Sequence, residues 1–296
     1  MPADSITIFG EALFDCFPDD SRILGGAPFN VAWHLQGLGA EPLFVSRIGR
    51  DAAGAELLAA MQNHGMRQNG VETDTARPTG SVAVSIDNGQ PSYHILEAQA
   101  YDYIAATELP AGSELGLLYH GSLALRHDVS RATFEQIKRQ WRGPVFFDVN
   151  LRAPWWDADA VHQWMSAADW LKLNDEELAL LLPEEHAIDS KLQLLQQRYD
   201  LQGVVVTRGE HGALALTQTG EFAAVQPAAS NEVVDTVGAG DAFAAVVLLG
   251  IDRGWPLRLT LARAQDFASA IVGRRGATVR DPEFYRQFSA AWSLIG

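Results

Sequence analysis

The sequence has little cysteine and no long apolar run, and both shortages narrow the class of protein. The single Cys16 excludes an internal disulfide and a metal site made of several cysteines. The apolar stretch at 242–251 is only about half of the roughly 20 residues that cross a bilayer. The first ten residues show no basic region followed by a long apolar run, which is the pattern of a secretion signal. We therefore expect a soluble, cytoplasmic protein.

Positive charge is scarce as well. Lysine and arginine number 22 against 37 aspartates and glutamates, which gives a net charge of −15, and lysine occurs only at Lys138, Lys172 and Lys191. Such a field repels phosphate backbones and anionic lipid, so we expect neither nucleic acid nor membrane as a partner. An anionic ligand would need a local site of backbone N–H groups, metal and a few arginines. The eight histidines show no H-x-x-x-H spacing and no cysteine partner, so we interpret them as structural or surface residues.

Apolar residues make up 47% of the chain, which is ample for a buried core. Short β-rich apolar runs alternate with amphipathic stretches, which predicts an α/β fold with a doubly wound, mostly parallel sheet flanked by helices. The expected strands are 6–9, 43–48, 117–119, 145–147, 170–173 and 204–207. The expected helices are 28–38, 52–64, 131–141, 175–182, 190–199, 240–250, 256–272 and 282–294. Pro28, Pro256 and Pro282 each suit a first helical turn.

Two segments break this alternation, at about 11–24 and 80–104. The second alternates apolar and polar residues around Asn88-Gly89, which is a strong hairpin signal. We interpret both segments as antiparallel strands that form a small β-sheet lid beside a ligand crevice. Another hairpin is expected at Thr219-Gly220. No repeat or linker divides the sequence, so we expect one domain over 1–296.

The motif with the clearest chemistry is DTVGAGDAF at 235–243, which precedes an apolar helical run. Gly238 and Gly240 let the backbone fold closely around an anion, and the following helix presents unpaired N–H groups and a positive dipole end. The pattern predicts an anion hole. Asp241 lies in the first helical turn, where it either acts in chemistry or only balances the helix dipole.

A second glycine-rich motif, GGAPFNVAWHLQGLG, stands at 25–39. Its paired glycines, Gly25 and Gly26, directly precede a helix that starts with proline and carries Asn30 on its first turn. A small polar ligand could lie against these three residues. The alternative is a plain Gly-Gly turn with Asn30 acting as a helix cap.

The early GGAPFNVA and the late DTVGAGDAF together resemble the two signatures of the ribokinase/PfkB carbohydrate kinases. The intervening FDVNLR at 147–152, KLNDEE at 172–177 and VVTRGEHGA at 205–213 resemble further landmarks of that family in the same order. The resemblance covers the whole chain. It implies a ribokinase-like fold and transfer of the γ-phosphate of ATP to a sugar hydroxyl.

By this resemblance, Asp241 is the general base, and Gly238, Ala239 and Gly240 supply N–H groups to the transferred phosphoryl. Asn174 and Glu177 would face Mg²⁺ through water, or else serve as a helix cap and a surface acid. Arg152 would bridge phosphate oxygens and approach the sugar, or else form a surface ion pair.

The resemblance also assigns the two substrate pockets. The nucleotide would contact the following residues: Thr207, Gly209, Gly212, Val225, Pro227, Gly276 and Ala277. A monovalent cation such as K⁺ would involve Asp235 and the 271–280 loop. The sugar would contact Asp15, Gly25, Gly26, Asn30 and Asn150, with Asp241 at the reacting hydroxyl.

GEALFD, GGAPFNVAWHL and DVNLR resemble the fructokinase branch most, although Val149 stands where a proline is often found in that family. Ribokinase and 2-keto-3-deoxygluconate kinase remain alternatives within the family. A non-catalytic sugar or nucleotide sensor would not need Asp241. A nicotinamide-dependent oxidoreductase would need a glycine fingerprint in the first βα unit, and the sequence has none there.

The charged residues and the strand edges of the lid predict the kind of sugar that is bound and the oligomeric state. No Lys or Arg occurs from residue 78 to 125, whereas Asp87, Glu97 and Asp102 do, which favours an uncharged sugar. Arg22 and Arg152 are the two cations that could oppose this expectation. The lid's exposed edges and the apolar Val82, Val84 and Ile86 predict a homodimer formed through the lid.

Overall fold

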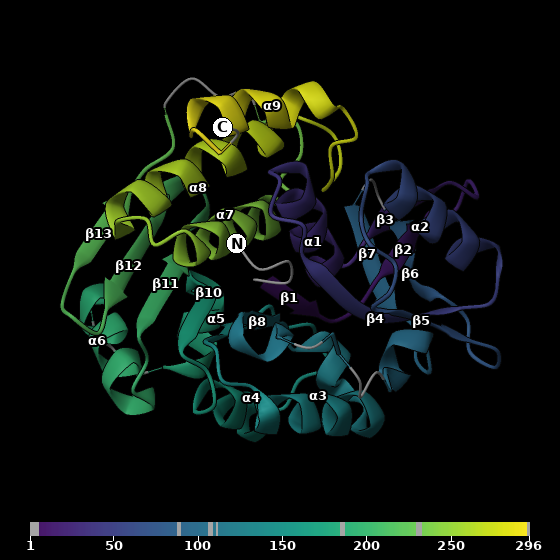
Figure 1. Ribbon diagram of the computed structural model, residues 1–296, viewed down its shortest axis with the longest axis horizontal. Helices are drawn as coiled ribbons and strands as arrows, with labels where there is room; N and C mark the ends of the chain where they lie inside the picture. Colours follow the sequence, from purple (N-terminus) through teal and green to yellow (C-terminus); the bar gives the residue numbers. More distant parts are fainter. Residues whose placement is uncertain are drawn as a thin grey trace. The chain divides into compact units, whose positions relative to one another are not determined.

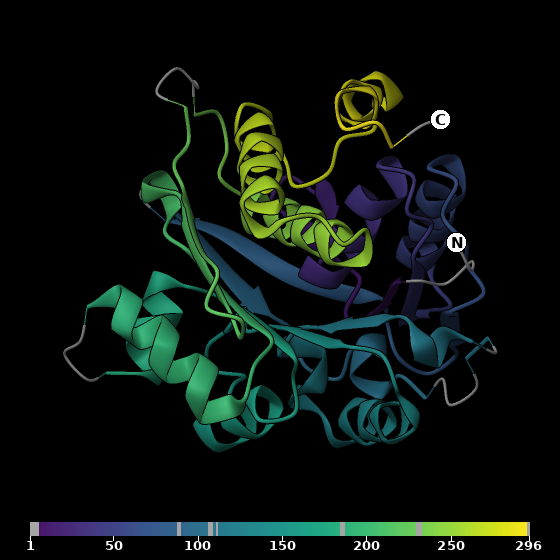
Figure 2. The same ribbon diagram turned by 60° about the vertical axis from the view of Figure 1, so that its left-hand side comes forward.

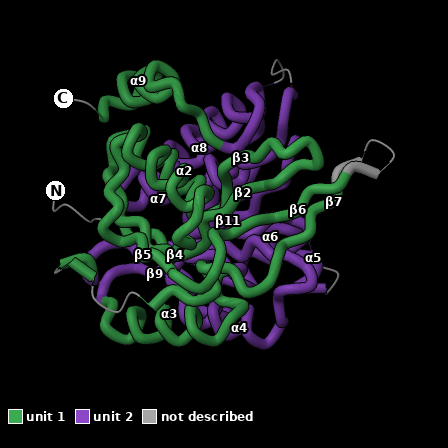
Figure 3. Tube along the Cα trace, turned by 90° about the vertical axis from the view of Figure 1, so that its right-hand side faces the viewer, with its two compact units in different colours: residues 1–113, 124–141, 278–296 green, residues 114–123, 142–277 purple. Residues whose placement is uncertain are grey.

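The computed structural model describes residues 6–87, 90–105, 109–110, 112–183, 187–228 and 233–294. Contacts divide the chain into two compact units (Figure 3). Unit 1 comprises residues 1–113, 124–141 and 278–296, and unit 2 comprises residues 114–123 and 142–277. In the described part of the chain, no helix is both long and apolar enough to cross a membrane.

Unit 2 is built on strands that are parallel up to a final antiparallel hairpin (Figure 1). The parallel strands are β8 (Leu117–His120), β9 (Val145–Asp148), β10 (Trp170–Asn174) and β11 (Gly203–Thr207). Strands β12 (Ala213–Thr217) and β13 (Phe222–Val225) complete the order β13-β12-β11-β10-β9-β8 and pair antiparallel to their neighbours. The hairpin predicted at Thr219-Gly220 is confirmed. Strand β11 reads as one apolar run because Val204, Val205 and Val206 are all fully buried.

Helices cover both faces of the unit 2 strands. They are α4 (Ala158–Met165), α5 (Asp175–Leu181), α6 (Ile188–Tyr199), α7 (Ala239–Asp252) and α8 (Leu257–Val272). Figure 2 shows α7 and α8, in yellow-green, on the opposite side of these strands from α6. Residues 242–250 of α7 are all buried, which explains why this helix is apolar around its whole circumference.

Unit 1 holds a parallel set of strands, β1 (Ile6–Phe9), β4 (Leu43–Gly49) and β5 (Val71–Asp74), in the order β1-β4-β5. Its helices are α1 (Ala27–Gly37), α2 (Ala52–Asn63), α3 (Asp128–Gln140) and α9 (Pro282–Ala291). Its core includes Ile6, Ile8 and Phe9, which are at most 1% exposed. The expectation of an α/β fold with a mostly parallel sheet and a smaller second sheet is confirmed.

The small sheet of unit 1 has four strands in the order β3-β2-β6-β7. They are β2 (Leu13–Cys16), β3 (Arg22–Gly25), β6 (Gly80–Asp87) and β7 (Gln90–Ile95). The expectation of a purely antiparallel lid is wrong in one place, because β2 and β6 pair in parallel. Each of these two strands begins its own hairpin, so joining the hairpins through their first strands makes the sheet mixed. The predicted turn Asn88-Gly89 lies outside the described residues.

Most predicted element boundaries agree with the structure to within a few residues, but the start of α3, the position of Pro256 and the existence of α4 were not predicted correctly. Helix α3 begins at Asp128 rather than at residue 131, because His127 accepts a hydrogen bond from the N–H of Val129 and caps the helix. Pro256 is the N-cap of α8 rather than a first-turn residue, whereas Pro28 and Pro282 do lie in first turns. Helix α4 was not predicted at all, although Asp157 caps it in the usual way.

Candidate active site

The start of α7 presents backbone donors to open space. Gly238 is the N-cap, with a left-handed backbone at φ 79°, and Asp241 lies in the first turn. The N–H of Ala239 donates to the Thr236 carbonyl at 3.3 Å. Gly240 is exposed, and among the described residues no hydrogen bond occupies its N–H. The first-turn N–H groups and the dipole therefore favour an anion at this point.

The two glycines of this motif do different things. The motif predicts a backbone role for both, but only Gly238 has a positive φ. A Cβ at Gly238 would also lie 2.4 Å from the Cβ of Ala277, closer than real carbon atoms approach. A Cβ at Gly240 would meet nothing nearer than the Lys172 Nζ at 3.8 Å. Gly238 is thus required by the fold, whereas Gly240 leaves space in front of the helix.

A carboxylate braces the loop before α7 against the loop after α8. Asp235 accepts the N–H of Val237 on one oxygen and the N–H of Gly276 on the other, each at 3.0 Å. Ala277 is buried and packs against Gly238. Three predicted site regions, at Asp235, Gly238 and Gly276-Ala277, are therefore brought together within unit 2.

A buried ion pair lies beside the same helix start. The Lys172 ammonium on β10 donates to both carboxylate oxygens of Asp148 on β9, at 2.8 and 2.9 Å. The two residues are 6% and 2% exposed. Burial alone would lower the pKa of Lys172, but Asp148 outweighs it, and with Glu177 and Asp241 raises that pKa above its ordinary value.

Sequence reasoning gave Lys172 and Asp148 no role. The available signal was a single lysine inside the otherwise apolar strand WLKLN. A lysine in such a strand must be paired to be buried, because an unpaired buried charge is costly.

Asn174 and Glu177 form a capping box at the start of α5. The Asn174 side chain accepts the N–H of Glu177 at 2.8 Å, and the Glu177 carboxylate accepts the N–H of Asn174 at 2.9 Å. The second Glu177 oxygen accepts the N–H of Leu151 at 2.8 Å. The cap alternative for Asn174 is confirmed, but Glu177 is no surface acid, since it is 6% exposed. Its burial raises the pKa of Glu177 above the usual range, against these N–H donations.

Asn150 and Arg152 follow β9. Asn150 has a left-handed backbone, with φ 40°, and its carbonyl accepts the Ser122 hydroxyl at 3.1 Å. Arg152 is exposed, and its guanidinium donates to the Leu151 carbonyl at 3.0 Å. Within the described ranges Arg152 forms no ion pair, so its charge is available to a ligand.

The predicted nucleotide residues lie at neighbouring ends of the unit 2 strands. Thr207 ends β11 and pairs with Ala213, and Ala213 pairs with Val225 at the end of β13. Gly209 and Gly212 lie in the short connection between β11 and β12, where the Arg208 N–H donates to the Gly212 carbonyl at 2.7 Å. Pro227 follows β13 and is half-buried.

The predicted sugar residues other than Asn150 and Asp241 belong to unit 1. Asp15 lies on β2, and a Cβ at Gly25 on β3 would lie 3.7 Å from its Oδ2. Gly26 is the N-cap of α1 at φ 103°, and a Cβ there would lie 2.7 Å from the Glu11 carbonyl oxygen. Asn30 is buried in the first turn of α1, and its N–H donates to the Gly26 carbonyl at 2.8 Å. Unit 1 thus brings this group together.

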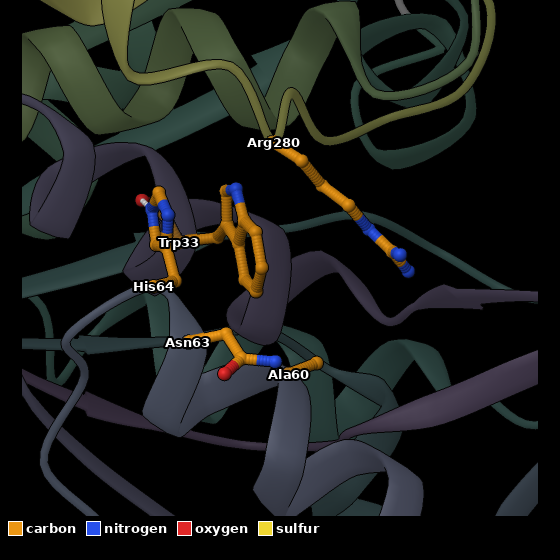
Figure 4. Close-up of a pocket in the computed structure, with 5 residues that line it drawn as sticks. All are labelled: Trp33, Ala60, Asn63, His64 and Arg280. Carbon is orange, nitrogen blue, oxygen red and sulfur yellow. Dashed lines mark hydrogen bonds between the residues drawn. The ribbon is translucent and has the colours of Figure 1, made fainter.

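A separate cavity in unit 1 contains none of the predicted residues. It measures about 90 Å³ and is lined by Trp33, Ala60, Asn63, His64 and Arg280 (Figure 4). The rings of Trp33 and His64 stack at 3.8 Å, and the Trp33 carbonyl holds His64 at 2.9 Å. Ligand pockets usually enclose about 300–1,000 Å³, so this cavity is smaller than a typical substrate site.

Comparison with known proteins identifies the class. Residues 10–283 match the family model described as pfkB family carbohydrate kinase. The chain is 32% identical to a fructokinase from Klebsiella pneumoniae, across 94% of this chain and 96% of that protein. The chain therefore belongs to the pfkB family of carbohydrate kinases, and it is a sugar kinase similar to fructokinases.

Solved structures agree on the fold, which is ribokinase-like as expected. An aminoimidazole riboside kinase from Salmonella enterica, complexed with aminoimidazole riboside and an ATP analog, has a TM-score of 0.81 at 25% identity, covering 96% of this chain and 99% of that one. A double-mutant fructokinase from Vibrio cholerae O395, bound to fructose, ADP and potassium ion, has a TM-score of 0.80 at 24% identity, covering 96% and 98%.

Proposed function

We propose that this chain is an ATP-dependent kinase that transfers the γ-phosphate of ATP to a hydroxyl of a free sugar, with fructose as the favoured acceptor. The observation that carries the proposal is the start of α7, where Asp241 stands in the first turn beside the exposed Gly240. A carboxylate next to backbone donors is what phosphoryl transfer to a hydroxyl requires. Fructokinase relatives at about 30% identity support the choice of sugar.

In the transfer step, the Asp241 carboxylate accepts the proton of the sugar hydroxyl as that oxygen bonds to the γ-phosphorus. The bond from phosphorus to the β-phosphate oxygen breaks, and ADP leaves. Backbone N–H groups at Gly238, Ala239 and Gly240 bind the charge on the phosphoryl oxygens. The Ala239 donor would have to leave its long 3.3 Å contact with Thr236. Arg152, which is exposed and has no ion pair among the described residues, would bridge the same oxygens.

The nucleotide would lie along the strand ends that carry Thr207, Gly209 and Gly212, with the adenine toward Val225 and Pro227. Gly276 and Ala277 would form the opposite wall. Register supports this arrangement, because it places Thr207 and Val225 on either side of Ala213.

The residues present fit a magnesium ion held through water. Each oxygen of the buried Glu177 carboxylate accepts one N–H, which leaves a lone pair on each for a water molecule. No cluster of three His, Cys, Asp or Glu side chains forms in the described part of the chain, so the phosphates and waters would supply the other ligands. When bound, the ion would neutralise phosphate charge. Asn174 would hold Glu177 in the position that binds this water.

A monovalent cation such as K⁺ would be bound by the Asp235 carboxylate, which lies between the loop before α7 and the loop after α8.

The sugar would be bound by Asp15, Gly25, Gly26, Asn30 and Asn150. Carboxylate and amide groups suit hydroxyls, because each oxygen accepts hydrogen bonds and each amide also donates them.

Two charged groups named in the sequence analysis turn out to be engaged elsewhere. Asp102, counted there as a carboxylate for sugar hydroxyls, is 1% exposed and forms an ion pair with Arg126 at 2.7 Å, so it is withdrawn from that role. Arg22 pairs with Glu56 on the surface, which removes it as a partner for a substrate carboxylate. The loss of Asp102 removes one argument for a neutral acceptor, whereas the engagement of Arg22 favours a neutral acceptor and leaves Arg152 as the cation to be tested.

We expect kcat/KM to be highest for an uncharged sugar. Rates of ADP release should be compared for fructose, ribose, aminoimidazole riboside, 2-keto-3-deoxygluconate and fructose 6-phosphate at saturating Mg-ATP with K⁺. A tenfold preference for either charged compound corresponds to about 1.4 kcal/mol in transition-state binding and would overturn the neutral-acceptor proposal. A preference for aminoimidazole riboside would instead indicate an aminoimidazole riboside kinase, like the Salmonella enterica neighbour. Sugar or nucleotide binding with no ADP release would favour a sensor.

The lid would also form a homodimer. Val82 and Val84 are each 5% exposed within this chain, so they need no partner to cover them, contrary to the sequence-based reason. What supports the dimer is that β3 and β7 are edge strands of the small sheet, and that Ile23 and Tyr93 on them are 41% and 54% exposed. Sedimentation at micromolar concentration should show a dimer that Ile23→Lys with Tyr93→Lys dissociates. A wild-type chain that sediments only as monomer would exclude it.

A further inference from the structure

The lysine in β10 has an environment that stability alone does not explain. Lys172 is 6% exposed and lies near carboxylates from three elements: Asp148 on β9, Glu177 on α5 and Asp241 on α7. A buried ion pair is weak evidence for stability, because well-packed apolar residues of similar volume are often as good or better. The position of this ion pair beside the start of α7 therefore suggests a function.

The hydrogen bonds of the Lys172 ammonium leave one of its N–H donors for a ligand. An ammonium has three N–H donors, and two of those on Lys172 go to the two oxygens of Asp148. No hydrogen bond occupies the third within the residues that the structure describes. The Nζ lies 3.8 Å from the point where a Cβ on Gly240 would stand, and Gly240 is the exposed residue at the start of α7. The charge thus faces the position where backbone donors already favour an anion.

Asp148 fixes this charge in place. It holds the ammonium through two short hydrogen bonds and is itself held by the Tyr119 hydroxyl, which donates to Oδ2 at 3.3 Å. A cation held by groups that need not move is effective at stabilising developing charge, because nothing has to reorganise during the reaction.

We propose that Lys172 is a catalytic residue of the kinase, the fixed cation that binds the γ-phosphoryl oxygens at the start of α7, and that Asp148 is its positioning residue. The proposal rests on the proposed phosphoryl transfer and deepens it. It explains why one of only three lysines in an acidic chain is buried at this point.

The competing explanation is that the pair only supports the fold, and a double variant separates the two. Lys172→Met alone leaves the Asp148 carboxylate buried without its partner, which destabilises any protein. The combination of Asp148→Asn with Lys172→Met removes both charges at nearly constant shape, and the asparagine oxygen can still accept from Tyr119. If the pair serves only stability, this double variant regains both the melting temperature and the activity.

We expect the double variant to regain the melting temperature but not the activity. Its kcat should stay on the order of 10²-fold below wild type, the usual loss for one group that stabilises transition-state charge. Calorimetry should show that a non-hydrolysable ATP analogue binds at least about tenfold more weakly, whereas the Kd for ADP, which lacks the γ-phosphoryl, changes less than about threefold. Lys191→Met is the matched control, because among the described residues Lys191, in the same unit, donates only to the Leu182 carbonyl; the substitution should change neither value.

The experiment distinguishes failure of the Lys172 proposal from failure of the proposed kinase function. Wild-type protein that phosphorylates no sugar would refute the proposed function itself. An active wild type with a double variant that keeps its kcat, or that loses ADP and analogue affinity equally, would refute the role of Lys172. If the double variant melts early, Lys172→Arg, which keeps the charge but displaces it, should still weaken analogue binding more than ADP binding; equal effects would also refute the role.

Discussion

Replacing Asp241 by asparagine is expected to lower kcat by about 10²–10⁴-fold, which is the usual loss for a general base. The asparagine keeps the size and polarity of the half-buried side chain in the first turn of α7, so the fold should be preserved. It cannot accept the proton of the sugar hydroxyl. ATP affinity, measured by calorimetry, should stay close to wild type, because the backbone donors of the turn are unchanged.

Asp252→Asn is a matched control for this prediction. Asp252 is the last residue of the same helix and pairs with Arg253 at 3.6 Å. The same substitution there should leave kcat within about twofold of wild type, because a contact at the far end of α7 takes no part in the proton transfer. If Asp241→Asn also kept near wild-type kcat, Asp241 would only balance the helix dipole, and another group would have to be the base.

Gly238→Val is expected to be the most damaging change to the anion hole. A β-branched residue is an outlier at a positive φ, and its Cβ would overlap that of Ala277 at 2.4 Å. Either the loop before α7 or the Gly276-Ala277 stretch must move, which would displace the first-turn donors. We expect the melting temperature to fall by at least about 5 °C and kcat by on the order of 10²-fold.

Gly240→Ala provides the comparison, because Gly240 has neither the positive φ nor the close neighbour of Gly238. A methyl group at Gly240 meets the Lys172 Nζ at an ordinary 3.8 Å, and the backbone there is helical. The melting temperature should therefore stay within about 2 °C, since alanine favours the helix. The larger Gly240→Val should also fold but weaken ATP binding by crowding the anion. Equal loss of melting temperature at both positions would contradict the separate roles given to these glycines.

The parts of the fold that could be predicted are those whose signal is local. The strand β11 is apolar along its length because both its faces are buried, and α7 is apolar all round for the same reason. Helix α4 escaped prediction because it is short, and only its Asp157 cap marked it. The parallel pairing of β2 with β6 joins residues far apart in the chain, and no periodicity within either strand reports it.

The candidate site divides in the same way. The backbone role of Gly238 follows from the motif, because a glycine before a helix suits a left-handed cap. The engagement of Asp102 could not be foreseen, since its partner Arg126 lies just beyond the cation-free stretch and reaches back to it. The pairing of Lys172 with Asp148 was equally hidden, because it depends on β9 and β10 being neighbours.

If this chain moves a phosphoryl group from ATP to a free sugar, the products of the fructose reaction will show it. Phosphorus NMR of wild-type protein with ATP, Mg²⁺, K⁺ and fructose should show a new sugar phosphomonoester that accumulates one for one with ADP. Both products should accumulate about 10²–10⁴-fold more slowly with Asp241→Asn. Release of inorganic phosphate in place of the phosphomonoester, or no consumption of ATP with any sugar of the panel, would contradict the account.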